Sequence, residues 1–276
     1  MTVITTERLS PTVGALVLGV DRERLASDDA FPVWCLDALE ANGALVFRDL
    51  HLDDEAQVAF SRKLGTVEKL GKGDNPEIFR ITLDPTKNSA AKYLKGTFDW
   101  HIDGMTEDIP IMATLLAAHA VAEEGGETEF ASTYQAYDDL SDEEKREFED
   151  VRVEHTFEAA QRMHKPNPTE EELAWWRQRP SKVHPLVWTH ESGRKSLVLG
   201  ATTAGVVGKS PEDGRAFLND VLERSTRPER VYRHTWSVGD LVIWDNRGVL
   251  HRACRYAPGS SRDMHRTTLY GNEAVQ

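Results

Sequence analysis

Two histidines and one aspartate are spaced so that they could hold a single metal ion. His101 and Asp103 are two residues apart, and side chains at such positions point to the same side of an extended chain. His251, far downstream, would complete the set. Two imidazoles and one carboxylate leave three positions of an octahedron open, an arrangement typical of Fe(II) oxygenases. The remaining histidines, His119 and His265 among them, are expected to be ordinary surface or core residues.

Two arginines downstream of His251 could bind an anion. Arg262 and Arg266 are four residues apart, so they would share one face of a strand. A guanidinium group binds a carboxylate through two parallel hydrogen bonds. Thr128, which follows a pair of glycines, could donate a further hydrogen bond. Plainer interpretations stay open here: the arginines could form a solvated strand edge, and Thr128 could be an ordinary turn residue.

The charge balance limits the partners that this chain could bind. Its 276 residues include 46 Asp and Glu against 33 Lys and Arg, which gives a net charge of −13. Such a surface repels phosphate backbones and anionic membranes, so we expect no nucleic-acid or membrane partner. Any anion must therefore be held by a local group of basic side chains. We expect a small-molecule substrate and a homo-oligomer.

Cysteine usage and the N-terminus bear on the cellular location. Cys35 and Cys254 are far apart and lie in no CxxC pattern, which favours neither a zinc ribbon nor a disulfide framework. The N-terminal residues lack a basic start followed by an apolar stretch, so we expect no signal peptide. No apolar run approaches the roughly 18 residues of a membrane span. We therefore expect a cytoplasmic protein.

Short apolar runs suggest many strands with helices between them. The expected strands cover residues 13–20, 44–47, 78–83, 111–119, 186–189, 196–199, 230–236, 240–244, 249–253 and 264–270. The expected helices cover residues 32–41 and 53–64, follow capping boxes at Ser141 and Thr169, and begin at Ser210. The run 111–119 would also suit a short buried helix. Because regular βαβ alternation is absent in the last third, the pattern predicts one mainly β domain, residues 1–276, with inserted helices.

The candidate metal and anion residues belong to longer stretches with a specific order and spacing. These stretches are residues 100–103, 125–128, 184–197 and 238–266. Together they resemble the taurine dioxygenase / 2,4-dichlorophenoxyacetate dioxygenase (TauD/TfdA) family of Fe(II)/2-oxoglutarate-dependent enzymes. The C-terminal third looks closer to the phenoxyacetate branch.

The resemblance implies a double-stranded β-helix, or jelly roll, with helical insertions. It also implies that His101, Asp103 and His251 ligate Fe(II). Thr128 and Arg262 would hold the distal carboxylate of 2-oxoglutarate, the co-substrate used with O2. The implied reaction hydroxylates, and thereby in some cases cleaves, a small organic substrate, with release of succinate and CO2.

The resemblance narrows the substrate only in part. Arg266 would contact the acid group of an anionic substrate, which favours a carboxylate-bearing molecule. Residues 65–72 contain no histidine at the place where the taurine enzyme uses one for its sulfonate, which argues against taurine itself. Asp99, Glu107 and Asp108, near the HxD motif, would suit a cationic amino group, so an amino acid is a second candidate.

Two other functions would use the same His/Asp/His set. A zinc hydrolase would hold its metal in this way, but it gives no reason for Thr128 and Arg262. A non-catalytic metal-binding jelly roll would tolerate loss of a ligand, yet all three are present. Related halogenases replace the carboxylate ligand, so Asp103 favours hydroxylation. Residues 87–98, just before the HxD motif, are expected to lie over the active site as a mobile segment.

Overall fold

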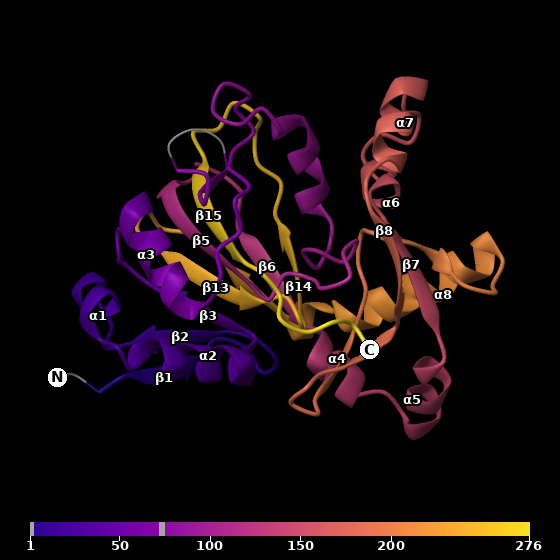
Figure 1. Ribbon diagram of the computed structural model, residues 1–276, viewed down its shortest axis with the longest axis horizontal. Helices are drawn as coiled ribbons and strands as arrows, with labels where there is room; N and C mark the ends of the chain where they lie inside the picture. Colours follow the sequence, from indigo (N-terminus) through magenta and orange to yellow (C-terminus); the bar gives the residue numbers. More distant parts are fainter. Residues whose placement is uncertain (1–2, 72–74) are drawn as a thin grey trace.

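One large sheet dominates the computed structural model, which describes residues 3–71 and 75–276 (Figure 1). In the described residues this sheet has the strand order β1-β2-β3-β13-β5-β15-β4, and all its pairs are antiparallel except β2 with β3. Its strands are β1 Thr5–Arg8, β2 Ala15–Leu18, β3 Ala44–Phe47, β4 Phe79–Ile81, β5 Ala113–Ala120, β13 Leu241–Asp245 and β15 Asp263–Leu269.

Smaller sheets accompany the large one. An antiparallel sheet with the order β12-β6-β14 consists of β6 Thr128–Ser132, β12 Val231–His234 and β14 Val249–Ala253. A second, with the order β11-β7-β8, consists of β7 Arg152–Thr156, β8 Ser181–Pro185 and β11 Thr203–Val206. The hairpin expected around residue 193 pairs β9 Val187–Thr189 with β10 Lys195–Leu197.

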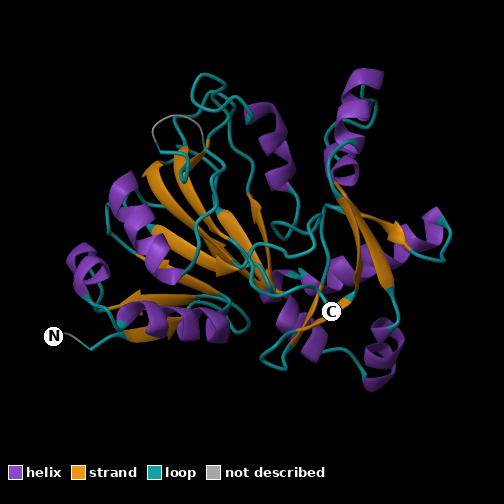
Figure 2. Ribbon diagram, in the orientation of Figure 1, coloured by secondary structure: helices purple, strands orange, loops and turns teal. Residues whose placement is uncertain are grey.

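The helices lie around the sheets and do not alternate regularly with parallel strands (Figure 2). They are α1 Arg22–Ser27, α2 Phe31–Asn42, α3 Asp54–Leu64, η1 Ala91–Phe98, α4 Thr133–Asp138, α5 Asp142–Glu149, α6 Phe157–Arg162, α7 Glu170–Arg177, α8 Pro211–Ser225 and η2 Pro228–Arg230. Both expected capping boxes are formed, at the starts of α5 and α7. Helices α6 and α7 project away from the large sheet (Figure 1).

The central strands of the large sheet are buried on both faces, and their alternate residues pack into different cores, whereas the edge strand β1 is exposed. In β3, Leu45 and Phe47 pack with α2 and α3, whereas Val46 packs toward Phe130 of β6 and Val249 of β14. Burial on both faces explains why β3 reads as an unbroken apolar run instead of an alternating one. The pocket described below lies on the face that turns toward β6 and β14.

Most of the expected elements are present, and those that were not expected are short. The run 111–119 is a strand, as favoured from the sequence. Helices α1, α4 and α6 have six residues each, too few to show helical periodicity in the sequence. The fold therefore combines mixed sheets with more helical segments than expected. Among the described residues, none of the helices has both the length and the apolar character needed to cross a membrane.

Candidate metal centre and active site

The structure brings the three predicted metal ligands together. His101 and His251 face each other across an isolated antiparallel bridge, closed by two backbone hydrogen bonds of 3.0 and 2.9 Å. The Nε2 atoms of both histidines lie 3.8 Å from the nearer carboxylate oxygen of Asp103. All three ligand atoms lie within 4.8 Å of one another. Small side-chain movements would bring them to the roughly 2.0–2.2 Å at which such ligands bind a metal ion.

A turn, and not a continuous strand, aims Asp103 at the histidines. Only His101 is in a bridge, and Asp103 begins a turn, so the expectation of an extended HxD segment is wrong at its second ligand. Gly104 follows with a φ of +84°, and a Cβ there would lie 2.6 Å from the backbone nitrogen of Ile111. The turn therefore requires glycine immediately after the carboxylate.

A chain of buried hydrogen bonds fixes the Asp103 carboxylate. Thr114 donates to its Oδ2 over 3.1 Å, and Asn246 donates to the Thr114 hydroxyl over 2.9 Å. Trp244 donates in turn to the Asn246 side-chain oxygen over 3.2 Å. Sequence reasoning missed Thr114 and Asn246 because their positions in β5 and after β13 become neighbours only in the folded sheet. Partners of this kind orient a metal ligand.

The charges in the centre suit a divalent cation. Burial raises the pKa of Asp103, but Arg266, His251 and His101 lower it more, to about 2. Burial, followed by the neighbouring His101, lowers the pKa of His251 well below its usual range. Asp99 accepts a 2.8 Å hydrogen bond at its backbone oxygen from His101 Nδ1, which leaves Nε2 for a metal. Carboxylate and neutral imidazole are the forms that bind metal ions.

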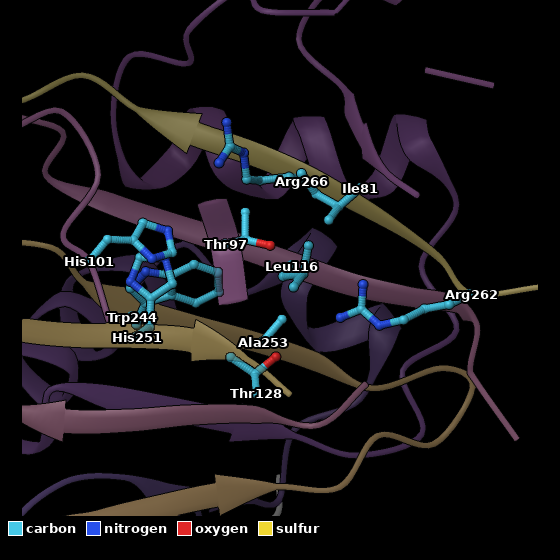
Figure 3. A pocket seen from close by; sticks show the side chains of 10 residues that line it. All are labelled: Ile81, Thr97, His101, Leu116, Thr128, Trp244, His251, Ala253, Arg262 and Arg266. Carbon is cyan, nitrogen blue, oxygen red and sulfur yellow. The ribbon is translucent and has the colours of Figure 1, made fainter. Parts of the chain in front are cut away.

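One pocket connects the metal centre with the predicted anion-binding residues (Figure 3). His101 and His251 lie at one end of it, Arg262 lies at the other, and Thr128 lies between them. The pocket is lined by Ile81, Thr97, His101, Leu116, Thr128, Trp244, His251, Ala253, Arg262 and Arg266. Its two ends would suit the two ends of a short dicarboxylic acid.

Arg262 is a buried cation without a carboxylate partner among the described residues. The residue is 2% exposed, and its guanidinium lies over the ring of Tyr256. Its Nε donates to the Gly126 backbone oxygen over 3.3 Å, while Nη1 has no hydrogen-bond partner in the described part of the chain. Burial lowers its pKa. A buried charge without a counter-ion is unfavourable, so an anion bound here would stabilise it. The alternative of a solvated strand edge is therefore wrong for Arg262.

Thr128 is the second residue expected at this end of the pocket. It is buried at the start of β6, and its hydroxyl oxygen accepts a 3.0 Å hydrogen bond from Trp236 Nε1. Because the indole uses an oxygen lone pair, the hydroxyl proton is directed to a different acceptor. Thr128 can therefore donate a hydrogen bond into the pocket.

Arg266 lies on the metal side of the pocket. Its Nη1 is 3.6 Å from Asp103 Oδ2, and its guanidinium also lies over the ring of Phe79. Glu68, which sequence reasoning missed, is half-buried nearby; burial raises its pKa and the charge of Arg266 opposes that effect. Glu68 belongs to the segment 65–72, which contains no histidine; Lys72 at its end lies outside the described residues.

The acids near the HxD motif are mostly engaged elsewhere. Asp99 pairs with His164, and Asp108 pairs with Lys182 at 2.5 Å. Two of the three carboxylates that could bind a substrate amino group therefore already have basic partners.

The segment before the HxD motif lies beside the pocket, as expected. Residues 91–98 form η1, and Thr97 lines the cavity. The ring of Tyr93 stacks on Trp175 of α7 with 4.9 Å between centroids, and Phe98 contacts Tyr256 edge-on at 5.8 Å. These aromatic contacts join η1 to the projecting helices and to the ring that covers Arg262. The mobility of the segment stays a prediction.

Comparison with known proteins identifies the family. The model described as "Taurine catabolism dioxygenase TauD, TfdA family" matches residues 5–268. The chain belongs to this family. It is 34% identical over 284 residues to a TauD/TfdA-family relative, the alpha-ketoglutarate-dependent 2,4-dichlorophenoxyacetate dioxygenase of Cupriavidus pinatubonensis; the match covers 97% of this chain and 98% of that protein.

Two further family comparisons agree with this one. The (S)-phenoxypropionate/alpha-ketoglutarate-dioxygenase of Sphingobium herbicidovorans is 31% identical over 276 residues, which cover 97% of this chain and 95% of that protein. The crystal structure of AAD-2 in complex with Mn(II) and N-oxalylglycine superimposes with a TM-score of 0.84 and 32% identity, over 99% of this chain and 100% of that one.

Proposed function

We propose that this chain is an Fe(II)- and 2-oxoglutarate-dependent dioxygenase that hydroxylates a C–H bond of a small organic acid. The observation that carries the proposal is the pocket itself, with a His/Asp/His cluster at one end and, at the other, the Arg262 guanidinium, which has no carboxylate partner among the described residues. A zinc hydrolase or a non-catalytic metal-binding protein has no use for that buried cation. Relatives named as alpha-ketoglutarate-dependent dioxygenases further support the oxygenase.

The chain's own residues would position the reactants. His101, Asp103 and His251 would hold Fe(II), because two imidazole nitrogens and one carboxylate oxygen are donors that this ion accepts. Fe(II) supplies the activation of O2 that couples substrate hydroxylation to conversion of 2-oxoglutarate into succinate and CO2. Thr114 and Asn246 would keep the carboxylate turned toward the ion.

Arg262 and Thr128 would select the co-substrate. The guanidinium would pair with the distal carboxylate of 2-oxoglutarate, and the Thr128 hydroxyl would donate a second hydrogen bond to it. Since Arg262 is buried, little water competes for that ion pair. Its position at the far end of the pocket would leave the 2-oxo acid end directed toward the metal ligands.

Arg266 would receive the acid group of the primary substrate. It keeps Nε without a partner among the described residues, while Nη1 remains near Asp103. The curated relatives named for phenoxyacetate and phenoxypropionate support a carboxylate substrate. Where the hydroxylated carbon bears an ether oxygen, the product would break down into a carbonyl compound and a released alcohol or phenol.

The arrangement of the two main sheets is also part of the proposal. We infer a double-stranded β-helix in which the large sheet faces the β12-β6-β14 sheet across the pocket. The core residues that the two sheets share support this arrangement and a single domain over residues 1–276. The cytoplasmic location and the homo-oligomer expected from the sequence stay predictions.

The activity is tested by O2 uptake with Fe(II), with and without 2-oxoglutarate. We expect uptake to require both, to be inhibited by competing Zn(II), and to disappear in Asp103→Ala. Anaerobic titration should show a weak visible charge-transfer band in the parent protein and a diminished band in Asp103→Ala. Hydrolysis supported by Zn(II), without consumption of 2-oxoglutarate, would replace the oxygenase with the zinc hydrolase.

The substrate class is tested with matched pairs of acids and neutral analogues, scored by succinate formed above the uncoupled background. Phenoxy acids should give more succinate than their amides, and Arg266→Ala should remove that preference. Amino acids and sulfonates complete the panel. If amides turn over as well as acids, and Arg266→Ala leaves the pattern unchanged, then Arg266 does not bind the acid group of the substrate.

A further inference from the structure

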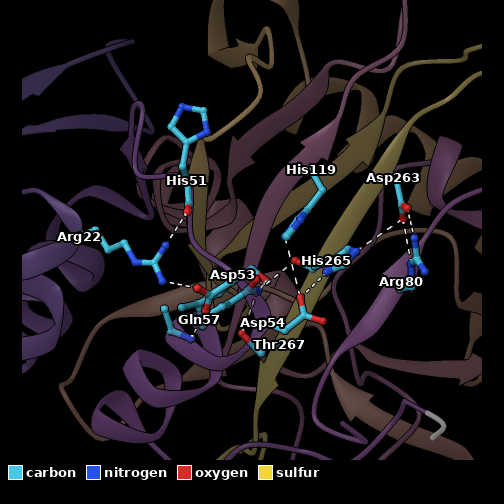
Figure 4. Close-up of polar contacts among 12 residues, drawn as sticks. Arg22, His51, Asp53, Asp54, Gln57, Arg80, His119, Asp263, His265 and Thr267 are labelled. Atoms are coloured by element: carbon cyan, nitrogen blue, oxygen red, sulfur yellow. Dashed lines mark hydrogen bonds and ion pairs between the residues drawn. The ribbon is translucent and has the colours of Figure 1, made fainter. Parts of the chain in front are cut away.

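A second group of side chains with metal-binding chemistry lies outside the pocket (Figure 4). Asp54 is the first residue of α3, His119 lies in β5 and His265 lies in β15. One ligand atom from each lies within 4.8 Å of the other two. Sequence analysis treated both histidines as ordinary residues because they are 146 positions apart, and Asp54 as part of a helix start.

This second group lies on the opposite face of the large sheet from the active site. Successive side chains of a strand point to opposite faces, and Arg266 lines the pocket. Its neighbour His265 therefore points the other way, toward α3, where Nδ1 lies 2.5 Å from Asp54 Oδ1. The group is thus separate from the candidate iron ligands, although β15 contributes to both places.

Helix α3 is held firmly enough to fix the position of Asp54. Gln57 donates to the backbone oxygen of His265 over 3.0 Å, and Ser61 shares a 2.7 Å hydrogen bond with Thr267. Asp53 caps the helix by accepting from the backbone nitrogen of Ala56 at 2.8 Å. The carboxylate at the helix start is therefore presented at a set point over β15.

An irregularity in β5 places the second imidazole. Asp263 pairs with Ala120 and Met264 pairs with Ala118, so His119 is the extra residue at a register shift. Such irregularities commonly redirect a side chain. Here the ring of His119 stacks on that of His265, with 3.7 Å between the centroids and 20° between the planes.

The His119 ring has a free nitrogen directed at this group. Its Nε2 is buried, has no hydrogen-bond partner among the described residues and lies 4.0 Å from Asp54 Oδ1. The side chains of His119 and Asp54 are 30% and 38% exposed, so an ion could enter from solvent.

The surroundings resemble the environment of a metal ligand. Asp263 Oδ1 lies 3.8 Å from His265 Nε2, the nitrogen that points away from Asp54. This distance is too long for a hydrogen bond, but a carboxylate so near the second nitrogen attracts the positive charge that a ligating imidazole acquires. Asp263 also pairs with Arg80 and, at 3.3 Å, with Lys87, so the nearby cations are partly neutralised.

We propose that Asp54, His119 and His265 form a second metal site, which binds Zn²⁺ or a similar divalent transition metal. Two imidazole nitrogens and one carboxylate oxygen are the donor set that such ions prefer, and water would complete the coordination. The ion would replace the direct contact between His265 and Asp54 and would bridge α3 to β5 and β15. The site is independent of the oxygenase reaction proposed above.

Metal stoichiometry of the full-length chain tests the site. Equilibrium dialysis against micromolar Zn²⁺, with metal counted by mass spectrometry, should give two ions per chain for the parent. Asp103→Ala and His119→Ala should each retain one ion, and the double variant should retain none. His119→Ala is the preferred change because the free Nε2 contributes no hydrogen bond to the fold.

Matched variants separate this site from nonspecific zinc binding and from damage to the fold. His51→Ala, at an exposed histidine beside Asp49, should still bind two ions. Co²⁺ in the Asp103→Ala background should give visible ligand-field bands that disappear with His119→Ala, and unchanged circular dichroism would exclude unfolding. If the parent binds one ion, which Asp103→Ala loses and His119→Ala keeps, the second site does not exist.

Discussion

Arg262 shows how strongly burial determines what an arginine can bind. In the sequence it is one of several arginines near His251, and charge alone does not separate it from its neighbours. Arg252 is a surface residue that pairs with Glu129 at 2.6 Å. Arg262 is enclosed, lies over an aromatic ring and keeps an unpaired nitrogen in the described structure. Because a buried charge without a counter-ion is unfavourable, this arrangement supports the proposal that Arg262 binds an anion.

Replacing Arg262 with glutamine should therefore weaken co-substrate binding selectively. Loss of a charge-assisted hydrogen bond costs about 1.5–3 kcal/mol, so the apparent KM for 2-oxoglutarate should rise roughly tenfold to a hundredfold. Steady-state kinetics measure the change. Arg233→Gln is the matched control because Arg233 is exposed and pairs with Glu129 at 2.5 Å. Equal KM values for Arg262→Gln and the parent would exclude this role.

At the scale of elements, the active site depends on short turns that join the strands. The bridge between His101 and His251 positions two of the proposed ligands, and the turn through Gly104 positions the third. That turn has no room for a side chain, since its Cβ would lie 2.6 Å from a backbone nitrogen. A strand alone could not bring Asp103 to the histidines in this way.

Gly104→Ala should consequently impair metal binding more than it impairs folding. A positive φ costs an alanine about 1–2 kcal/mol, and the close contact with Ile111 should also displace Asp103. We expect at least a tenfold loss of Fe(II) affinity, measured by anaerobic titration. Gly193→Ala is the control, because Gly193 has a similar φ of +83° and nothing within 4 Å of its Cβ. It should lose comparable stability in urea but no Fe(II) affinity.

Local sequence signals predicted the elements that local interactions stabilise. The capping boxes at Ser141 and Thr169 and the hairpin of β9 with β10 are formed. The family pattern also predicted that His101, Asp103, His251 and Arg262 lie near one another, and the structure brings them to one site; their roles stay predictions. Thr114, Asn246 and Glu68 were missed since their roles arise from contacts across strands and loops. The spacing of apolar residues predicts helices and strands, but it does not predict contacts between distant segments.

Buried histidines make the stability of the fold depend on pH. Several are enclosed by the small sheets and the core, and each must stay neutral to remain buried without cost. His155 is the clearest case: burial, followed by the charge of His184, lowers its pKa to about 3. Its Nδ1 lies 2.9 Å from the hydroxyl of Thr202, which joins β7 to the start of β11.

This pKa shift predicts destabilisation by acid. A histidine of the unfolded chain titrates near 6.5, so below that pH the unfolded state takes up a proton that folded His155 refuses until about pH 3. The stabilising contribution is complete above pH 6.5 and is lost as the pH falls toward 3. Urea unfolding from pH 7 to 4 should show a slope lower by up to about 1.4 kcal/mol per pH unit in His155→Leu. Identical slopes would contradict the assignment.

The alternation of side chains along β15 has a consequence for how this protein can change. Arg266 lies on the pocket face of β15, as does Arg262 immediately before the strand, while Asp263 and His265 lie on the opposite face. A substitution on the face toward α3 leaves the side chains of the pocket face in place, so the residues on the two faces can change independently. A single inserted or deleted residue within the strand would exchange the faces. We therefore expect relatives to vary at every second position here, while the length of this segment stays constant.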